Sequence, residues 1–95
     1  MNLFLDYQIR FLYILKKLQK KRVIHLPKKL TNFTVELPPK GHEANMSYNA
    51  AMMLAGVNKK SPLELAEILK KHFMINFTEF EKINIAKPGF ININF

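Results

Sequence analysis

The sequence predicts an α+β fold in which helices pack on one face of a four-stranded, mainly antiparallel sheet. Three observations predict it: a helical apolar pattern near the N-terminus, a strong helix-start signal at Ser61, and apolar–polar alternation in two segments near the C-terminus, Lys82–Ala86 and Phe90–Phe95. The predicted order is helix, two strands, two helices, two strands. Neither a repeat nor a long linker interrupts the chain, so we expect residues 1–95 to form a single domain.

The first predicted helix runs from Asn2 to about Lys21. Its apolar side chains recur at helical spacing, and Asn2 is suited to cap the first turn. The basic cluster Lys16–Arg22 falls in the last turns, where a helix C-terminus attracts positive charge. A solvated helix end that compensates the dipole explains this cluster more simply than a dedicated phosphate clamp.

Two short strands are predicted next, Val23–Leu26 and Phe33–Leu37. The second alternates apolar and polar residues, which is typical of a sheet that packs on one side only. We expect its inward-facing side chains to be Phe33, Val35 and Leu37. His25 has no second metal-type ligand at a useful spacing, so we interpret it as structural.

A pair of helices follows. The first is predicted over Asn45–Gly56, with the asparagine as its cap and the glycine as its stop. The second begins at Ser61-Pro62-Leu63-Glu64, which combines a capping box with proline at the first helical position, and runs to about His72.

The last two strands are predicted at Lys82–Ala86 and within Lys87–Phe95, where Pro88-Gly89 supplies a turn. Because side chains alternate along a strand, the final strand has two different faces. Its core face holds Ile91, Ile93 and Phe95, and its other face holds Phe90, Asn92 and Asn94.

The second face of the final strand is the candidate functional site. A phenyl ring can stack on a nucleic-acid base, and amides can bond to the base edge. The predicted RNA-contacting residues are Phe90, Asn92, Asn94, the neighbouring-strand Asn84 and the basic Lys87. An edge strand whose polar face is merely solvated is the simpler alternative, and the pattern alone favours it.

Charge and composition narrow the possible partners. Fifteen Lys and Arg against seven Asp and Glu give a net charge of +8, which favours an anionic partner, nucleic acid before membrane. Asp6, Gln8 and Arg10 interrupt the N-terminal apolar run, so we expect neither a membrane span nor a signal peptide. The absence of cysteine suits a reducing compartment, and we expect a cytoplasmic protein.

The sequence offers no catalytic constellation. It has no glycine-rich phosphate loop, no paired histidines at metal spacing and no nucleophile beside a base. One acidic cluster, at Glu79 and Glu81, stands alone. We therefore predict no catalytic residue, no metal site and no cofactor in this chain.

Four motifs resemble, in order and spacing, the N-terminal additional domain of arginyl-tRNA synthetases. They are Glu36-Leu37-Pro38-Pro39, Ser47-Tyr48-Asn49-Ala50-Ala51-Met52, Ser61-Pro62-Leu63-Glu64-Leu65-Ala66 and Pro88-Gly89-Phe90-Ile91-Asn92. The last is the most specific. The resemblance covers nearly the whole chain and is weakest over the first thirty residues. The chain departs from the family at Glu43-Ala44-Asn45, where His-Gly-Asp is usual.

The resemblance implies a domain that precedes a Rossmann-type catalytic domain and binds the elbow of tRNA(Arg). In that family an aromatic residue and an asparagine on the last strand meet a D-loop base, and Phe90 and Asn92 match those two positions. The implied partners are tRNA(Arg) and the catalytic domain of the same polypeptide. ATP and arginine would be used by the full-length arginine–tRNA ligase only, and the isolated domain would be inactive and monomeric.

The chain ends directly after a strand and lacks the synthetase catalytic signatures, so we interpret it as an excised part of a longer protein. Two other functions stay open at this point. One is a stand-alone RNA-binding module that tolerates many sequences, and the other is a structural domain whose sheet face docks a protein partner.

Overall fold

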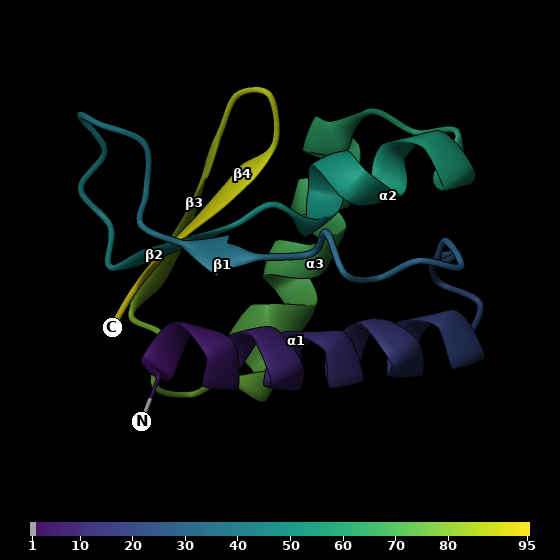
Figure 1. Cartoon of the computed structure of the whole chain (residues 1–95), viewed down its shortest axis with the longest axis horizontal. Helices are drawn as coiled ribbons and strands as arrows, with labels where there is room; N and C mark the ends of the chain where they lie inside the picture. The colour runs from purple at the N-terminus through teal and green to yellow at the C-terminus, as the bar shows by residue number, and fades with distance from the viewer. Residues whose placement is uncertain (1) are drawn as a thin grey trace.

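The computed structural model describes residues 2–95, which form three helices and a four-stranded sheet. In chain order the elements are α1 (Leu3–Lys20), β1 (Val35–Glu36), β2 (Met46–Tyr48), α2 (Ala50–Asn58), α3 (Pro62–Asn76), β3 (Lys82–Ala86) and β4 (Phe90–Asn94). The strand order is β1-β2-β4-β3 and every pair is antiparallel. The helices lie to one side of the sheet (Figure 1), which confirms the predicted fold class and element order.

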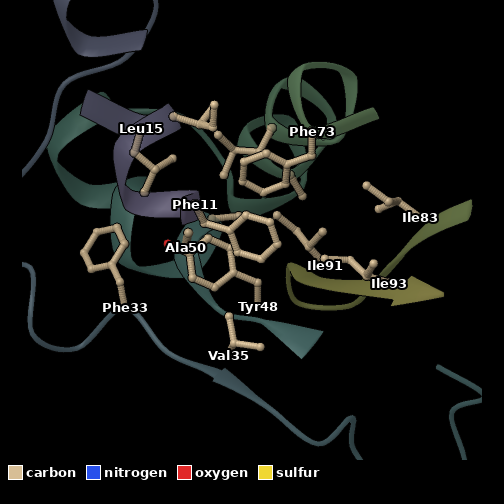
Figure 2. Close-up of a cluster of buried hydrophobic side chains, with 14 of the residues drawn as sticks. Phe11, Leu15, Phe33, Val35, Tyr48, Ala50, Phe73, Ile83, Ile91 and Ile93 are labelled. Carbon is tan, nitrogen blue, oxygen red and sulfur yellow. The ribbon is translucent and has the colours of Figure 1, made fainter. Parts of the chain in front are cut away.

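The core is built around the Phe11 ring of α1 (Figure 2). This ring stacks on Phe73 of α3 at a centroid distance of 4.5 Å and lies 4.8 Å from the Tyr48 ring of β2. Ile91 and Ile93 of β4 meet the cluster from the sheet and are fully buried. Aromatic rings bury large apolar areas, so this cluster joins two helices and the sheet into one core.

The first helix begins as the sequence predicts. The backbone N–H of Leu5 donates to Asn2 Oδ1 at 3.1 Å, so Asn2 caps the helix. One stripe of α1 is buried and consists of Tyr7, Phe11, Ile14, Leu15 and Leu18. The predicted amphipathic helix is therefore confirmed.

The predicted strand Val23–Leu26 is wrong, because this segment is irregular and pairs with no strand. Its backbone is satisfied by a side chain instead. The Asn58 amide accepts from the N–H of His25 at 2.8 Å and donates to its C=O at 2.9 Å. A side-chain amide thus takes the place of a neighbouring strand, and both bonds use the His25 backbone, whose side chain is exposed.

The second predicted strand, Phe33–Leu37, is shortened to β1. Phe33 and Val35 are buried as expected, but Leu37 is 76% exposed and does not face the core. Side chains again replace ladder bonds, since Gln8 Oε1 accepts from the Val35 N–H at 3.0 Å and Asn49 Oδ1 from the Thr34 N–H at 2.8 Å. These bonds hold the segment without extending the strand.

The predicted helix Asn45–Gly56 is wrong at both ends. Met46–Tyr48 is strand β2, which lies between β1 and β4, and the helix α2 starts only at Ala50. Asn45 caps no helix, because its Oδ1 accepts from the N–H of Phe95 at 2.9 Å. Pairing on both sides satisfies the β2 backbone, which outweighs the local helical pattern.

Helix α3 carries the capping box that the sequence predicts. Glu64 N–H donates to Ser61 Oγ at 3.1 Å, while Ser61 N–H donates to Glu64 Oε1 at 3.4 Å. The helix continues past His72 to Asn76, because its buried stripe extends to Phe73.

The β3–β4 hairpin has the predicted turn at Pro88-Gly89, with a cis peptide bond between Lys87 and Pro88. Gly89 is buried against the start of α3. A Cβ at this position would lie only 2.7 Å from Pro62 Cβ, so the close approach of the two segments requires glycine.

Both α1 and α2 end in a Schellman motif whose left-handed residue is a cation. Arg22, with φ 63°, follows α1, and the Val23 N–H donates to the Leu18 C=O at 2.9 Å. Lys59, with φ 51°, follows α2, and the Lys60 N–H donates to the Ala55 C=O at 3.4 Å. Glycine is the usual residue here, and another residue costs about 1 kcal/mol or more.

An ion pair ties α1 to the segment before β3. Tyr7 Oη donates to Glu79 Oε2 at 2.7 Å, and Arg10 lies 3.5 Å from the same oxygen. The Arg10 guanidinium also lies 4.9 Å from the ring centroids of Tyr7 and Phe77. The hydrogen bond from Tyr7 lowers the pKa of Glu79, and the Arg10 charge acts in the same direction.

We predict that Ser61→Ala lowers the free energy of unfolding by about 1 kcal/mol, because a backbone donor at the start of α3 loses its acceptor. Ser61→Asp is the matched control and should keep the parent stability, since aspartate caps equally well. Thermal or urea unfolding measures both variants. Equal melting temperatures for parent and Ser61→Ala would contradict the capping role.

We predict that part of the stability depends on ionised Glu79. Because the folded-state pKa is lowered, this contribution is complete above the unfolded-chain pKa of about 4.3 and is lost as pH falls through the lower folded-state pKa. The parent should therefore melt above Glu79→Gln near neutral pH, and the difference should vanish in acid. A difference that is constant from pH 7 to pH 3 would refute the prediction.

Candidate nucleic-acid interface

The face of the sheet away from the helices carries a row of polar side chains. Strand register places Glu36 opposite Ser47, Ser47 opposite Asn92, and Asn92 opposite Asn84. The row therefore crosses all four strands. Side chains paired in this way lie about 5 Å apart, so neighbouring polar groups of the row are within reach of one small ligand. We call this surface the open face.

The two faces of β4 are divided as the sequence predicts. Ile91 and Ile93 are fully buried in the core, and Asn92 lies in the row on the open face. Phe95 follows β4 and is 40% exposed, although its ring lies 5.5 Å from that of Tyr7 and 5.8 Å from that of Phe80. The sequence predicts Phe95 in the core, whereas in the structure its ring packs only at the edge of the core.

Asn92 is far less accessible than a solvated strand residue. It is 3% exposed, and within residues 2–95 its Oδ1 has no hydrogen-bond partner. Ser47 beside it is 5% exposed, with an unpartnered Oγ, and Asn94 Oδ1 is unpartnered as well. Buried polar atoms almost always have a hydrogen-bond partner. The unpartnered atoms of this cluster therefore either lower the stability of the fold or mark a place where a ligand binds.

Phe90 is half-buried at the edge of a hollow of about 190 Å³. Ser47, Glu36 and Pro39 also line this hollow. Its volume is below that of pockets for drug-sized ligands, and it suits a single flat ring system. The ring and the unpartnered hydroxyl therefore border one small space.

The remaining predicted residues lie around this surface. Asn84 is exposed on β3 and pairs with Asn92, while Asn94 is half-buried and pairs with Lys82. Lys87 is exposed in the turn before β4. The structure thus brings Phe90, Asn92, Asn94 and Asn84 to one face and leaves Lys87 at its rim.

Ser47 and Glu36 belong to the open face, but sequence reasoning did not select them. Ser47 was expected inside a helix, and Glu36 only as an outward residue of a strand. The signal for Ser47 was the apolar–polar–apolar order of Met46-Ser47-Tyr48, which also fits a strand. A carboxylate only accepts hydrogen bonds, so Glu36 would favour a base that presents an amino group.

Residues 2–95 contain no group of three His, Cys, Asp or Glu side chains arranged to hold a metal ion. Across the same residues, every helix is too short or too polar to traverse a bilayer.

Comparison with known proteins gives a consistent result. Residues 13–95 match the family model described as arginyl tRNA synthetase N terminal domain. The arginine–tRNA ligase of Pelagibacter ubique (strain HTCC1062) is 40% identical over 95 residues, which is 100% of this chain and 16% of the relative. The arginine–tRNA ligase of Wolbachia pipientis wMel is 36% identical over 94 residues, which is 99% of this chain and 16% of the relative.

Other arginine–tRNA ligases give shorter alignments of the same kind. The arginine–tRNA ligase of Bacillus subtilis (strain 168) is 41% identical over 63 residues, 66% of this chain and 11% of the relative. No solved structure matches the chain. The chain spans about a sixth of the length of its full-coverage relatives, and their shared region is the one that the family model describes. The chain therefore belongs to the family of arginyl-tRNA synthetase N-terminal domains.

Proposed function

We propose that this domain binds the elbow of tRNA(Arg), with Phe90 and Asn92 on a base of the D-loop. The observation that carries the proposal is the group of unpartnered polar atoms on the open face, next to a half-buried aromatic ring. Membership of the synthetase family supports RNA as the ligand. A net charge of +8 supports an anionic partner.

The two residues have different tasks. The Phe90 ring stacks on the face of a splayed-out base, a contact that every base can make. The Asn92 amide offers one acceptor and two donors in fixed geometry, so it selects among base edges. Asn84 and Asn94 flank Asn92 across the open face, and Lys87 adds charge for a phosphate at the rim.

Base reading requires a local rearrangement of the open face. Asn92 is 3% exposed in the free domain, so a base reaches its Oδ1 only after neighbouring side chains move aside. The unpartnered state of this oxygen favours that exchange, because a base N–H would supply the hydrogen bond that the free domain lacks.

In the whole enzyme the domain would position tRNA(Arg) for a catalytic domain of the same polypeptide. That domain would use ATP and arginine, and the present chain would contribute binding and orientation alone. We place the protein in the cytoplasm, where aminoacylation supplies translation, and we expect the isolated domain to be monomeric.

We predict that Phe90→Ala weakens binding to tRNA(Arg) by roughly 1 to 3 kcal/mol whichever base occupies the D-loop position, because stacking is tolerant of base identity. Asn92→Ala should mainly remove the preference among bases. Fluorescence titration against transcripts that differ at one D-loop base separates the two effects. The control Phe90→Tyr keeps the ring and should bind as the parent does.

A core variant tests the assignment of faces. Ile91→Ala should cost about 2 to 5 kcal/mol of stability, because the side chain is fully buried.

Amide chemical-shift mapping then locates the RNA on the parent domain. If Asn84, Phe90, Asn92 and Asn94 stay unshifted while another surface moves, the site is wrong. Equal binding of unrelated RNAs would favour a general RNA-binding module, and binding of none would favour a protein-docking domain.

A further inference from the structure

We propose that the domain has a second RNA contact, a phosphate-binding surface at the end where α1 and α2 terminate. We call this surface the basic end. It consists of the exposed cations Lys20, Lys21, Arg22, Lys59 and Lys60. The inference rests on the proposed function, because the phosphates would belong to the same tRNA whose base the open face holds.

Two segments distant in sequence meet at the basic end. The Asn58 side chain, in the last turn of α2, bonds to both backbone groups of His25 at 2.8 and 2.9 Å. It also donates to the Leu54 C=O at 2.8 Å, which fixes the amide on its own helix. The chain leaving α1 is therefore held beside the end of α2, away from the sheet (Figure 1).

The basic end has no carboxylate to neutralise it. Neither segment 7–35 nor segment 44–63 of the sequence contains an acidic residue. Within residues 2–95 the one salt bridge joins Arg10 to Glu79, near the start of α1. Several uncompensated cations on one surface attract phosphate and release the counterions that phosphate carries.

Compensation of the helix dipoles accounts for Lys20 but not for Arg22 and Lys59 of the basic end. Lys17 and Lys20 already lie in the last turn of α1, where they offset the negative helix end. Arg22 and Lys59 occupy the left-handed positions of the two Schellman motifs, which glycine fills at lower conformational cost. A cation is thus present at both positions in spite of the backbone preference, which points to a role outside the fold.

The basic end and the open face contact different parts of an RNA. The hollow lined by Asn2, Phe4 and Glu36 places the sheet edge beside the start of α1, and the basic end lies beyond the last turn of that helix. An 18-residue helix is about 27 Å long. The phosphates held by the basic end would therefore lie outside the immediate neighbourhood of the base.

The test compares two variants that each remove two charges. In Arg22→Gly/Lys59→Gly, glycine takes the positions it prefers, so the melting temperature should equal or exceed that of the parent. Affinity for a tRNA(Arg) transcript at 50 mM salt should fall several-fold, and the slope of log K against log salt should lessen by roughly 1.4 to 1.8. Lys70→Gln/Lys71→Gln on α3 is the charge-matched control and should keep the parent slope.

The outcomes separate this inference from the proposed function. If Arg22→Gly/Lys59→Gly keeps the affinity and the salt slope of the parent while Phe90→Ala binds tRNA more weakly, the proposed RNA contact at the basic end is wrong. The proposed base site is then unaffected. Equal losses in the control pair would also overturn it, because overall charge and not position would then govern binding. A parent domain that binds no tRNA, or binds anionic phosphatidylserine vesicles in its place, would overturn both.

Discussion

Burial of the Phe11 ring is the interaction on which the rest of the structure depends. It stacks on Phe73 of α3, lies edge-on to Phe77 and packs on Tyr48 of β2. A single side chain thus holds the first helix against both the third helix and the sheet. Because the helices of the described chain all lie on this side (Figure 1), no helix covers the other face of the sheet, and a polar row crosses that face.

Elements with local signals could be predicted from the sequence, and elements that depend on distant partners could not. The Asn2 cap, the Ser61 capping box and the alternation in β4 each lie within a few residues of the structure they specify. Strand β2 exists because it pairs with β1 on one side and with the distant β4 on the other, and segment 23–26 is irregular because Asn58 satisfies its backbone. The local pattern does not encode the contact with Asn58, and the three-residue alternation Met46-Ser47-Tyr48 is too short to decide between strand and helix.

The candidate site shows the same division. Alternation along β4 was sufficient to place Phe90 and Asn92 opposite Ile91, since it needs only the geometry of one strand. The burial of Asn92 and the presence of Ser47 beside it depend on register between strands, which a single segment does not encode. The amide that we propose as the base reader is therefore buried in the free domain, whereas the cations of the basic end are exposed. Long-range attraction would precede base recognition in such an arrangement.

The contact between Gly89 and Pro62 bears on how substitution data from this domain should be interpreted. A methyl group at position 89 would collide with the Pro62 ring at the start of α3. The hairpin and this helix can therefore pack closely only because residue 89 has no side chain. A saturation screen for tRNA binding would score Gly89 with its neighbour Phe90, because substitution of Gly89 would disturb the packing of the hairpin on α3. A parallel measurement of protein abundance would separate the two effects. Substitution of Gly89 should reduce the amount of folded protein, whereas substitution of Phe90 should reduce binding alone.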